Sequence, residues 1–185
     1  KVSKNLISYR RKFFDSTFLE LSLKIDKKFY KLPISTYNPI KSKKFFQKKY
    51  LENPFYNYFV MNFYTANKLI FFFICRKIEI KKYNTKIVRI IDFQGTIPNK
   101  VSLANVLTKY LINNKIEYID MLCHGFSKNI LENIGFLKKK NNQIIPDHFE
   151  PFTGKDAKLN FSILINKYKR NMILFKGDGD QDRPN

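Results

Sequence analysis

Cysteine is scarce in this chain of 185 residues, and the two that occur, Cys75 and Cys123, have no CxxC spacing. Disulfide frameworks and zinc sites need several cysteines, or cysteines and histidines at short spacings. Neither kind of site is therefore expected, and no metal site is assigned. Because both cysteines stand among apolar residues, we predict that they are reduced thiols in the core.

Long apolar runs are also missing. The longest, "LIFFFIC" at 69–75, is far shorter than the roughly 20 residues of a membrane-spanning helix and is typical of a buried strand. We therefore expect no transmembrane segment and a cytoplasmic protein. The sequence opens at Lys1 instead of methionine, so an upstream segment, including a targeting signal, could precede it.

Acidic residues and arginine are rare. Lysine and arginine total 35 against 15 aspartates and glutamates, which gives a net charge of +20. Arginine, the residue best suited to bidentate phosphate recognition, occurs at only six positions: 10, 11, 76, 89, 170 and 183. A lysine-dominated excess indicates a solvated surface more than a dedicated nucleic-acid site, which remains the less favoured alternative.

Apolar and aromatic residues are abundant, at 44% and 16%, and predict a packed globular domain. Residues 43–185 are assigned to this domain. Residues 1–42 are interpreted as an N-terminal strand (16–26) and a linker, which could belong to a larger chain. The segment 41–53 reads as a short helix that ends before Pro54.

The pattern along 56–95 predicts three strands joined by hairpins, with Asp92 near the carboxyl end of the third. A helix with Ser102 as its N-cap follows, then a strand over 116–125. This strand-helix-strand order predicts a right-handed crossover between parallel strands. A second helix is expected from Ser127 to Gly135, and strand pairs within 136–152 and 161–177.

This order of elements resembles the GNAT superfamily of acyl-CoA acyltransferases. Five stretches resemble a narrower group, the GNAT-like proteins encoded among bacterial lipopolysaccharide and capsule biosynthesis genes: "VRIIDFQG" (88–95), "EYIDMLCHG" (117–125), "NIGF" (133–136), "IIPDHFEPF" (144–152) and "FKGDGDQDRPN" (175–185). The implied fold is α/β (α+β), a GNAT-like mixed, mostly antiparallel sheet with one parallel crossover and flanking helices.

The same resemblance implies an acyltransferase of surface-polysaccharide biosynthesis that transfers an acyl group to an amine or hydroxyl of a nucleotide-linked or lipid-linked sugar. The alternative is a catalytically degenerate member that binds a glycan or a partner protein. The acyl donor of the superfamily is acyl-CoA, held by a Gln/Arg-x-x-Gly-x-Gly/Ala loop. Here the loop reads "FQGTIPNKVSLAN", and the pyrophosphate loop is not intact.

The residues left to hold coenzyme A are Gly95, Thr96, Asn99 and Lys100, together with the start of the following helix. Pro98 removes one amide donor.

The closing "GDGDQDRPN" is the most specific part of the resemblance and is assigned to substrate binding. In an extended segment Asp178, Asp180 and Asp182 project to one side with Arg183 opposite, an array suited to sugar hydroxyls. A loose calcium or magnesium site is one alternative. The other is structural, with aspartates capping a Gly-Asp-Gly turn and pairing with Arg183 or lysines.

Three residues are candidates for acid/base chemistry. His148 and Glu150 are two positions apart, so in an extended segment the carboxylate could orient the imidazole as a general base; a sheet-edge histidine is the structural alternative. His124 competes, because neighbouring Cys123 could be a thiol nucleophile. The plainer interpretation is that Cys123 is core and His124 caps a loop.

Asp92 and Asp120 end adjacent predicted strands and could line the same substrate-binding cleft. A carboxylate buried there needs a partner, which Arg89 or a loop amide could supply.

Overall fold

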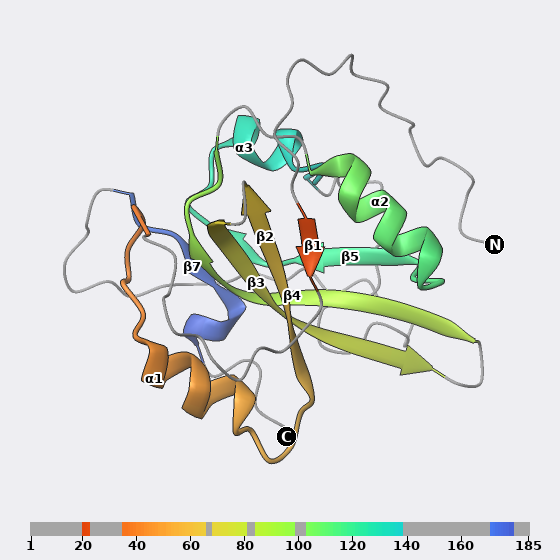
Figure 1. Ribbon diagram of the computed structural model, residues 1–185, viewed down its shortest axis with the longest axis horizontal. Helices are drawn as coiled ribbons and strands as arrows, with labels where there is room; N and C mark the ends of the chain where they lie inside the picture. The colour runs from red at the N-terminus through yellow and green to blue at the C-terminus, as the bar shows by residue number, and fades with distance from the viewer. Residues whose placement is uncertain are drawn as a thin grey trace.

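A computed structural model describes residues 20–22, 35–65, 68–80, 84–98, 103–138 and 171–179 (Figure 1). Its elements in chain order are β1 (Glu20–Ser22), α1 (Lys43–Phe46), the π-helical turn η1 (Gln47–Leu51), β2 (Tyr58–Thr65), β3 (Lys68–Ile80), β4 (Thr85–Gly95), α2 (Ala104–Asn113), β5 (Tyr118–Met121), β6 (Cys123–His124), α3 (Lys128–Asn133), β7 (Leu174–Phe175) and the 3₁₀ turn η3 (Lys176–Asp178).

Five strands form one sheet in the order β1-β2-β3-β4-β5. All neighbours are antiparallel except β4 and β5, which run parallel with α2 between them in the chain. The three predicted strands over 56–95 and the parallel pairing are thus confirmed. The fold is a mixed α+β arrangement around a mostly antiparallel sheet, as the sequence predicts at that level.

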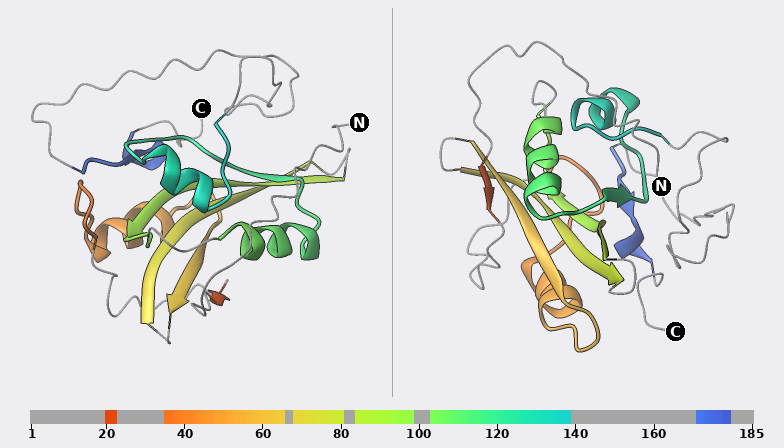
Figure 2. Two further views of the ribbon diagram at one scale, coloured as in Figure 1. Left: turned by 90° about the horizontal axis from the view of Figure 1, so that it is seen from above. Right: turned by 90° about the vertical axis from the view of Figure 1, so that its right-hand side faces the viewer.

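The predicted strand over 116–125 is wrong as a single element. β5 pairs with β4 only from Ile87 to Ile90, and the chain then turns away to form β6, which pairs with β7 in a second, two-stranded sheet. The oxygen of Leu122, between β5 and β6, accepts a 3.2 Å hydrogen bond from the Lys176 amide. The C-terminal segment therefore lies where β5 leaves β4 (Figure 2).

Apolar side chains cover both faces of the sheet. One face packs against α2 and α3, in the upper part of Figure 1, and its core includes Phe63, Phe71, Phe73, Phe93, Leu107 and Ile134. The other face packs against α1 and η1, and its core is Phe46, Tyr50, Tyr58, Val60, Phe72, Ile74 and Ile91. Alternate residues of β2 and β3 enter opposite cores, as the two-residue period of a strand requires.

The helix boundaries agree in part with prediction. The Ser127 hydroxyl caps α3 by accepting from the Ile130 amide at 3.3 Å, and Gly135 ends that helix with a φ of +93°, both as expected. The predicted N-cap of α2, Ser102, lies outside the described residues. α2 begins directly after Leu103, which is fully buried and makes no side-chain capping bond.

Other predicted elements fall partly outside the described residues. Of the strand expected over 16–26 only Glu20–Ser22 is described, and it pairs with β2. The helix expected over 41–53 is present as α1 and η1, with the Ser42 hydroxyl accepting from the Phe45 amide at 3.1 Å. In the described part of the chain no helix is both long and apolar enough to cross a membrane.

Phe73 provides a test of the larger core. Its ring is fully buried and lies against the rings of Phe63, Phe71 and Phe93. We expect Phe73→Ala to lower the free energy of unfolding by about 3–5 kcal/mol, because it leaves a cavity. Urea denaturation measures the change. Ile112→Ala is the control: that residue is 71% exposed, and its loss should cost no more than about 0.5 kcal/mol.

Candidate functional site

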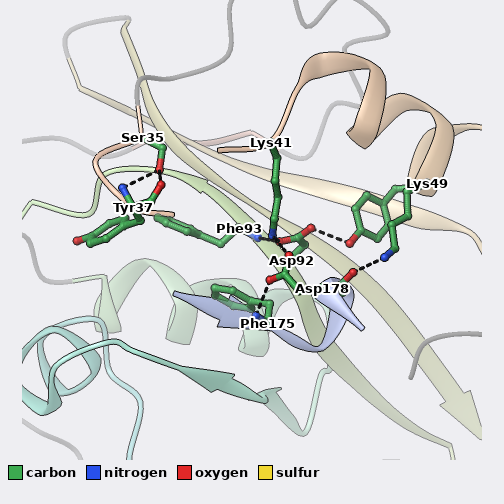
Figure 3. A network of polar contacts seen from close by, with 10 residues as sticks. Ser35, Tyr37, Lys41, Lys49, Asp92, Phe93, Phe175 and Asp178 are labelled. Atoms are coloured by element: carbon green, nitrogen blue, oxygen red, sulfur yellow. Dashed lines mark hydrogen bonds and ion pairs between the residues drawn. The ribbon is translucent and has the colours of Figure 1, made fainter. Parts of the chain in front are cut away.

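A buried polar cluster lies on the α1 side of the sheet where β5 ends (Figure 3). It comprises Lys41, Tyr50, Asp92 and Asp178, and is called here the Lys41 cluster. Lys41 precedes α1, Tyr50 belongs to η1, Asp92 to β4 and Asp178 to η3. Three segments distant in sequence, the α1–η1 segment, β4 and η3, thus meet at one point, and two of the predicted substrate-binding residues, Asp92 and Asp178, are brought together.

A bulge in β4 directs Asp92 into this position. Ile90 lies opposite Cys75 and Asp92 opposite Ile74, which leaves Ile91 as an extra residue in β4. Ile90 packs on the α2 side, whereas Ile91 packs on the α1 side and Asp92 bonds to Tyr50 there. The bulge therefore places two consecutive side chains, Ile91 and Asp92, on the same side of the sheet.

The Asp92 carboxylate is fully buried and surrounded by donors. Its Oδ1 forms an ion pair with Lys41 Nζ and accepts the Phe93 amide at 2.7 Å, while Oδ2 accepts the Tyr50 hydroxyl at 2.7 Å. Burial raises the pKa of Asp92, against the lowering effect of Lys41. Burial and the nearby Asp92 also raise the pKa of Tyr50, so its hydroxyl stays protonated and can donate.

Asp178 closes the cluster from the C-terminal side. Its Oδ1 lies 2.8 Å from Lys41 Nζ, and its Oδ2 accepts the Phe175 amide at 2.8 Å. The predicted extended geometry is wrong at this residue, because Lys176–Asp178 form a 3₁₀ turn that this carboxylate caps. The structural alternative, a turn-capping aspartate paired with a lysine, describes Asp178. Asp180, Asp182 and Arg183 lie outside the described residues.

Gly177 allows the turn to approach β4 closely. A Cβ added there would stand 2.1 Å from the Tyr50 hydroxyl oxygen and 2.9 Å from the Ile91 carbonyl oxygen, closer than any side chain tolerates. Lys49 of η1 also donates from its Nζ to the Gly177 carbonyl (Figure 3). The glycine of "FKGDG" is thus required by packing against the Lys41 cluster.

Backbone pairing between the segments before α1 and before β7 positions Lys41. The Asn38 amide donates to the Asn171 carbonyl at 3.0 Å, and the Ile173 amide donates to the Asn38 carbonyl at 2.8 Å. Sequence reasoning missed Lys41 as a site residue, since nothing distinguishes it from many other lysines. The bond of Tyr50 to Asp92 likewise had no signal in the sequence.

The predicted coenzyme A residues are only partly described, and the two described ones are engaged within the protein. Gly95 is the last residue of β4, buried, with a φ of +114°, and a Cβ there would lie 2.4 Å from the Ile70 carbonyl oxygen. The Thr96 amide donates to that same carbonyl at 3.3 Å. This amide is therefore not available to a pyrophosphate. Asn99 and Lys100 lie outside the described residues.

Cys75 and Cys123 are both free cysteines; Cys75 is buried, as expected of a core thiol, and Cys123 is partly buried. Burial raises the pKa of Cys123 to about 12, and this side chain packs against the larger core, so the thiolate needed for nucleophilic attack is disfavoured. His124 is exposed, and its backbone pairs with that of Leu174 in the β6–β7 sheet. His148 and Glu150 lie outside the described residues. Within the described segments no group of three or more metal-ligating side chains comes together.

Asp120 forms a separate ion pair with Arg89. The Arg89 Nε donates to Oδ1 at 3.0 Å, and Nη2 donates to Oδ2 at 2.8 Å, a bidentate arrangement. Arg89 was expected as a possible partner of a carboxylate at these strand ends. It forms its ion pair with Asp120, whereas Asp92 pairs with Lys41 and accepts a hydrogen bond from Tyr50. The two aspartates therefore belong to two different polar groups.

The charge balance of the Lys41 cluster gives an asymmetric prediction. Lys41→Met leaves two carboxylates facing each other without their shared cation and should cost about 3–5 kcal/mol of unfolding free energy. Asp92→Asn keeps the shape, leaves Lys41 paired with Asp178, and should cost only about 1 kcal/mol. Urea denaturation of both variants measures the difference.

The double variant Lys41→Met/Asp92→Asn serves as the internal check on this prediction. It should be more stable than Lys41→Met alone, because one of the two facing charges is gone. If Lys41→Met and Asp92→Asn lowered the free energy of unfolding by the same amount, the proposal that Lys41 is a shared cation would be contradicted.

Neighbouring glycines of the C-terminal turn provide a matched pair. Gly177→Ala should lower the unfolding free energy by about 1–3 kcal/mol, because its methyl group overlaps Tyr50 and β4. Gly179→Ala is the control, since an added Cβ there would meet nothing closer than 3.8 Å. Thermal denaturation compares them, and an equal effect of the two substitutions would show that the turn is not packed against Tyr50.

Comparison with known proteins adds no assignment: no family model matches the chain, and neither a curated protein nor a solved structure was found to be similar to it. The mixed α+β fold is therefore assigned from the structure alone.

Proposed function

We propose that the protein is a GNAT-fold acyltransferase-like protein of bacterial surface-polysaccharide biosynthesis, with acyl-CoA as donor and a nucleotide-linked or lipid-linked sugar as acceptor. The observation that carries the proposal is the Lys41 cluster, which ties Asp178 of the closing motif to Asp92 of β4. The most specific part of the resemblance is therefore anchored in the fold at that point. The mixed sheet with its parallel β4–β5 pair is consistent with the proposal.

Asp92 and Asp178 act in this proposal as positioning residues. Both carboxylates are already occupied by the protein's own donors, so they hold the closing segment and leave sugar recognition to other groups. We assign the contacts with sugar hydroxyls to Asp180, Asp182 and Arg183, which follow the anchored turn in sequence. Carboxylates and a guanidinium supply the acceptors and donors that such hydroxyls need.

The proposed chemistry is direct transfer. The acceptor nitrogen or oxygen attacks the acyl carbonyl carbon, His148 accepts the proton that the acceptor loses, and the carbon–sulfur bond breaks to release the thiolate of coenzyme A, which then takes up a proton from His148. Glu150 orients the imidazole of His148. A cysteine acyl-enzyme is not invoked, because the buried thiol of Cys123 has its pKa raised to about 12.

An activity assay tests this assignment. The full chain is incubated with a panel of acyl-CoA donors and amino-sugar and neutral sugar nucleotides, with detection of free thiol and of the mass gained by the acceptor. We expect turnover that falls by about 10²–10⁴-fold in His148→Ala. Cys123→Ala should keep the rate of the parent protein. Absence of turnover across the panel, or full activity of His148→Ala, would contradict the proposal.

A second candidate, a catalytically degenerate protein that binds glycan or a partner, is favoured by one observation. The Thr96 amide is committed to the Ile70 carbonyl, and Gly95 is packed against β3, so these two positions do not form a pyrophosphate cradle. Calorimetry with coenzyme A separates the candidates. Saturable binding supports the acyltransferase, whereas glycan binding without coenzyme A binding supports the degenerate protein.

A further inference from the structure

A second polar group lies on the same face of the sheet as Asp92, across three neighbouring strands. Arg76 of β3 is directly opposite Arg89 of β4, and Arg89 is directly opposite Asp120 of β5. Tyr118 lies two residues before Asp120 on β5, so it faces the same side and is the diagonal neighbour of Arg89. These four residues are called here the arginine face.

Arg89 has one unused pair of donors. The side chain is completely buried, and Nε and Nη2 donate to the carboxylate of Asp120. Its Nη1 atom is also buried and has no hydrogen-bond partner. A buried guanidinium nitrogen without an acceptor costs free energy, so this atom favours an acceptor from outside the chain.

Tyr118 supplies a second buried donor beside it. Its hydroxyl oxygen is buried and has no hydrogen-bond partner. Burial and the carboxylates of Asp120 and Glu117 raise the pKa of Tyr118 to about 12, while the guanidinium of Arg89 lowers it. At neutral pH the hydroxyl is therefore protonated and can donate a hydrogen bond to a ligand.

The charge at this place favours an anion. The guanidinium of Arg76 lies 4.1 Å from the centre of the Tyr56 ring and adds a second positive charge next to that of Arg89. Asp120 contributes the one carboxylate among the four residues, and its side chain is 15% exposed, so the group reaches solvent there. Within these four residues, two guanidinium groups and a neutral hydroxyl lie beside one carboxylate.

We propose that the arginine face binds an oxyanion, a phosphoryl or carboxylate group, whose oxygens accept from Arg89 Nη1 and the Tyr118 hydroxyl. Both ligands present charged oxygens that suit guanidinium donors. This site is separate from the Lys41 cluster, whose donors are taken by Asp92 and Asp178. It does not depend on acyl transfer, because a protein that catalyses no reaction would still bind the anion.

Anion titration of the full chain tests the site. Sodium phosphate, sodium diphosphate and sodium acetate are titrated in a calorimeter at constant ionic strength set with chloride, and thermal denaturation is recorded in parallel. We expect saturable binding of at least one of the three and a matching rise in melting temperature. Binding of phosphate and diphosphate alone would identify a phosphoryl site, and binding of acetate alone a carboxylate site.

Tyr118→Phe removes one donor without changing the shape of the ring. We expect anion binding to weaken at least about fivefold, because one hydrogen bond to the anion is lost. In anion-free buffer the same variant should be as stable as the parent or more stable, since it no longer buries an unbonded hydroxyl. A lower melting temperature in that buffer would show that the hydroxyl is bonded within the protein and would overturn the proposal.

Two further variants complete the test. Tyr110→Phe changes a buried tyrosine of α2, on the opposite face of the sheet, and should leave anion binding unchanged. Arg76→Gln removes the second positive charge and should weaken binding and make it less sensitive to salt. Absence of saturable binding for all three anions, or equal affinities of the parent and Tyr118→Phe, would overturn the proposal.

Discussion

The arrangement of the described chain depends on the two ion pairs that the ammonium group of Lys41 forms with Asp92 and Asp178. Lys41 pairs with Asp92 near the carboxyl end of β4 and with Asp178 of η3, and the Tyr50 hydroxyl donates to the same Asp92 carboxylate. Removing charges from water is expensive, and a shared cation with satisfied oxygens offsets that cost. The cluster therefore joins the α1–η1 segment, β4 and η3 through buried ion pairs and a hydrogen bond.

Hydrophobic periodicity was enough to predict the framework of the fold. The alternating and aromatic runs of β2, β3 and β4 and the amphipathic spacing of α2 mark those elements, and the Ser127 cap and Gly135 mark the ends of α3. Such signals lie within a few residues of each other, so each can be read locally. The parallel β4–β5 pair then follows from the order of the elements.

The features that were missed all depend on contacts between distant positions. The bulge at Ile91, the division of the predicted strand into β5 and β6, and the role of Lys41 have no local signature. The alternation of aspartates after Gly177 suggested an extended segment, whereas the capping bond of Asp178 to the Phe175 amide forms a turn. Local hydrogen bonding of an aspartate outweighed the strand-like spacing.

The pairing of Asn38 with residues 171–173, and of the α1–η1 segment with η3, has a consequence for biosynthesis. Lys49 and Gly177, joined by a hydrogen bond, are 128 positions apart, so this part of the structure requires nearly the whole described chain. During translation the hairpins of β2, β3 and β4 can form while later residues are still being added, because their contacts are local. The Lys41 cluster can be completed only after η3, which carries Asp178, has left the ribosome.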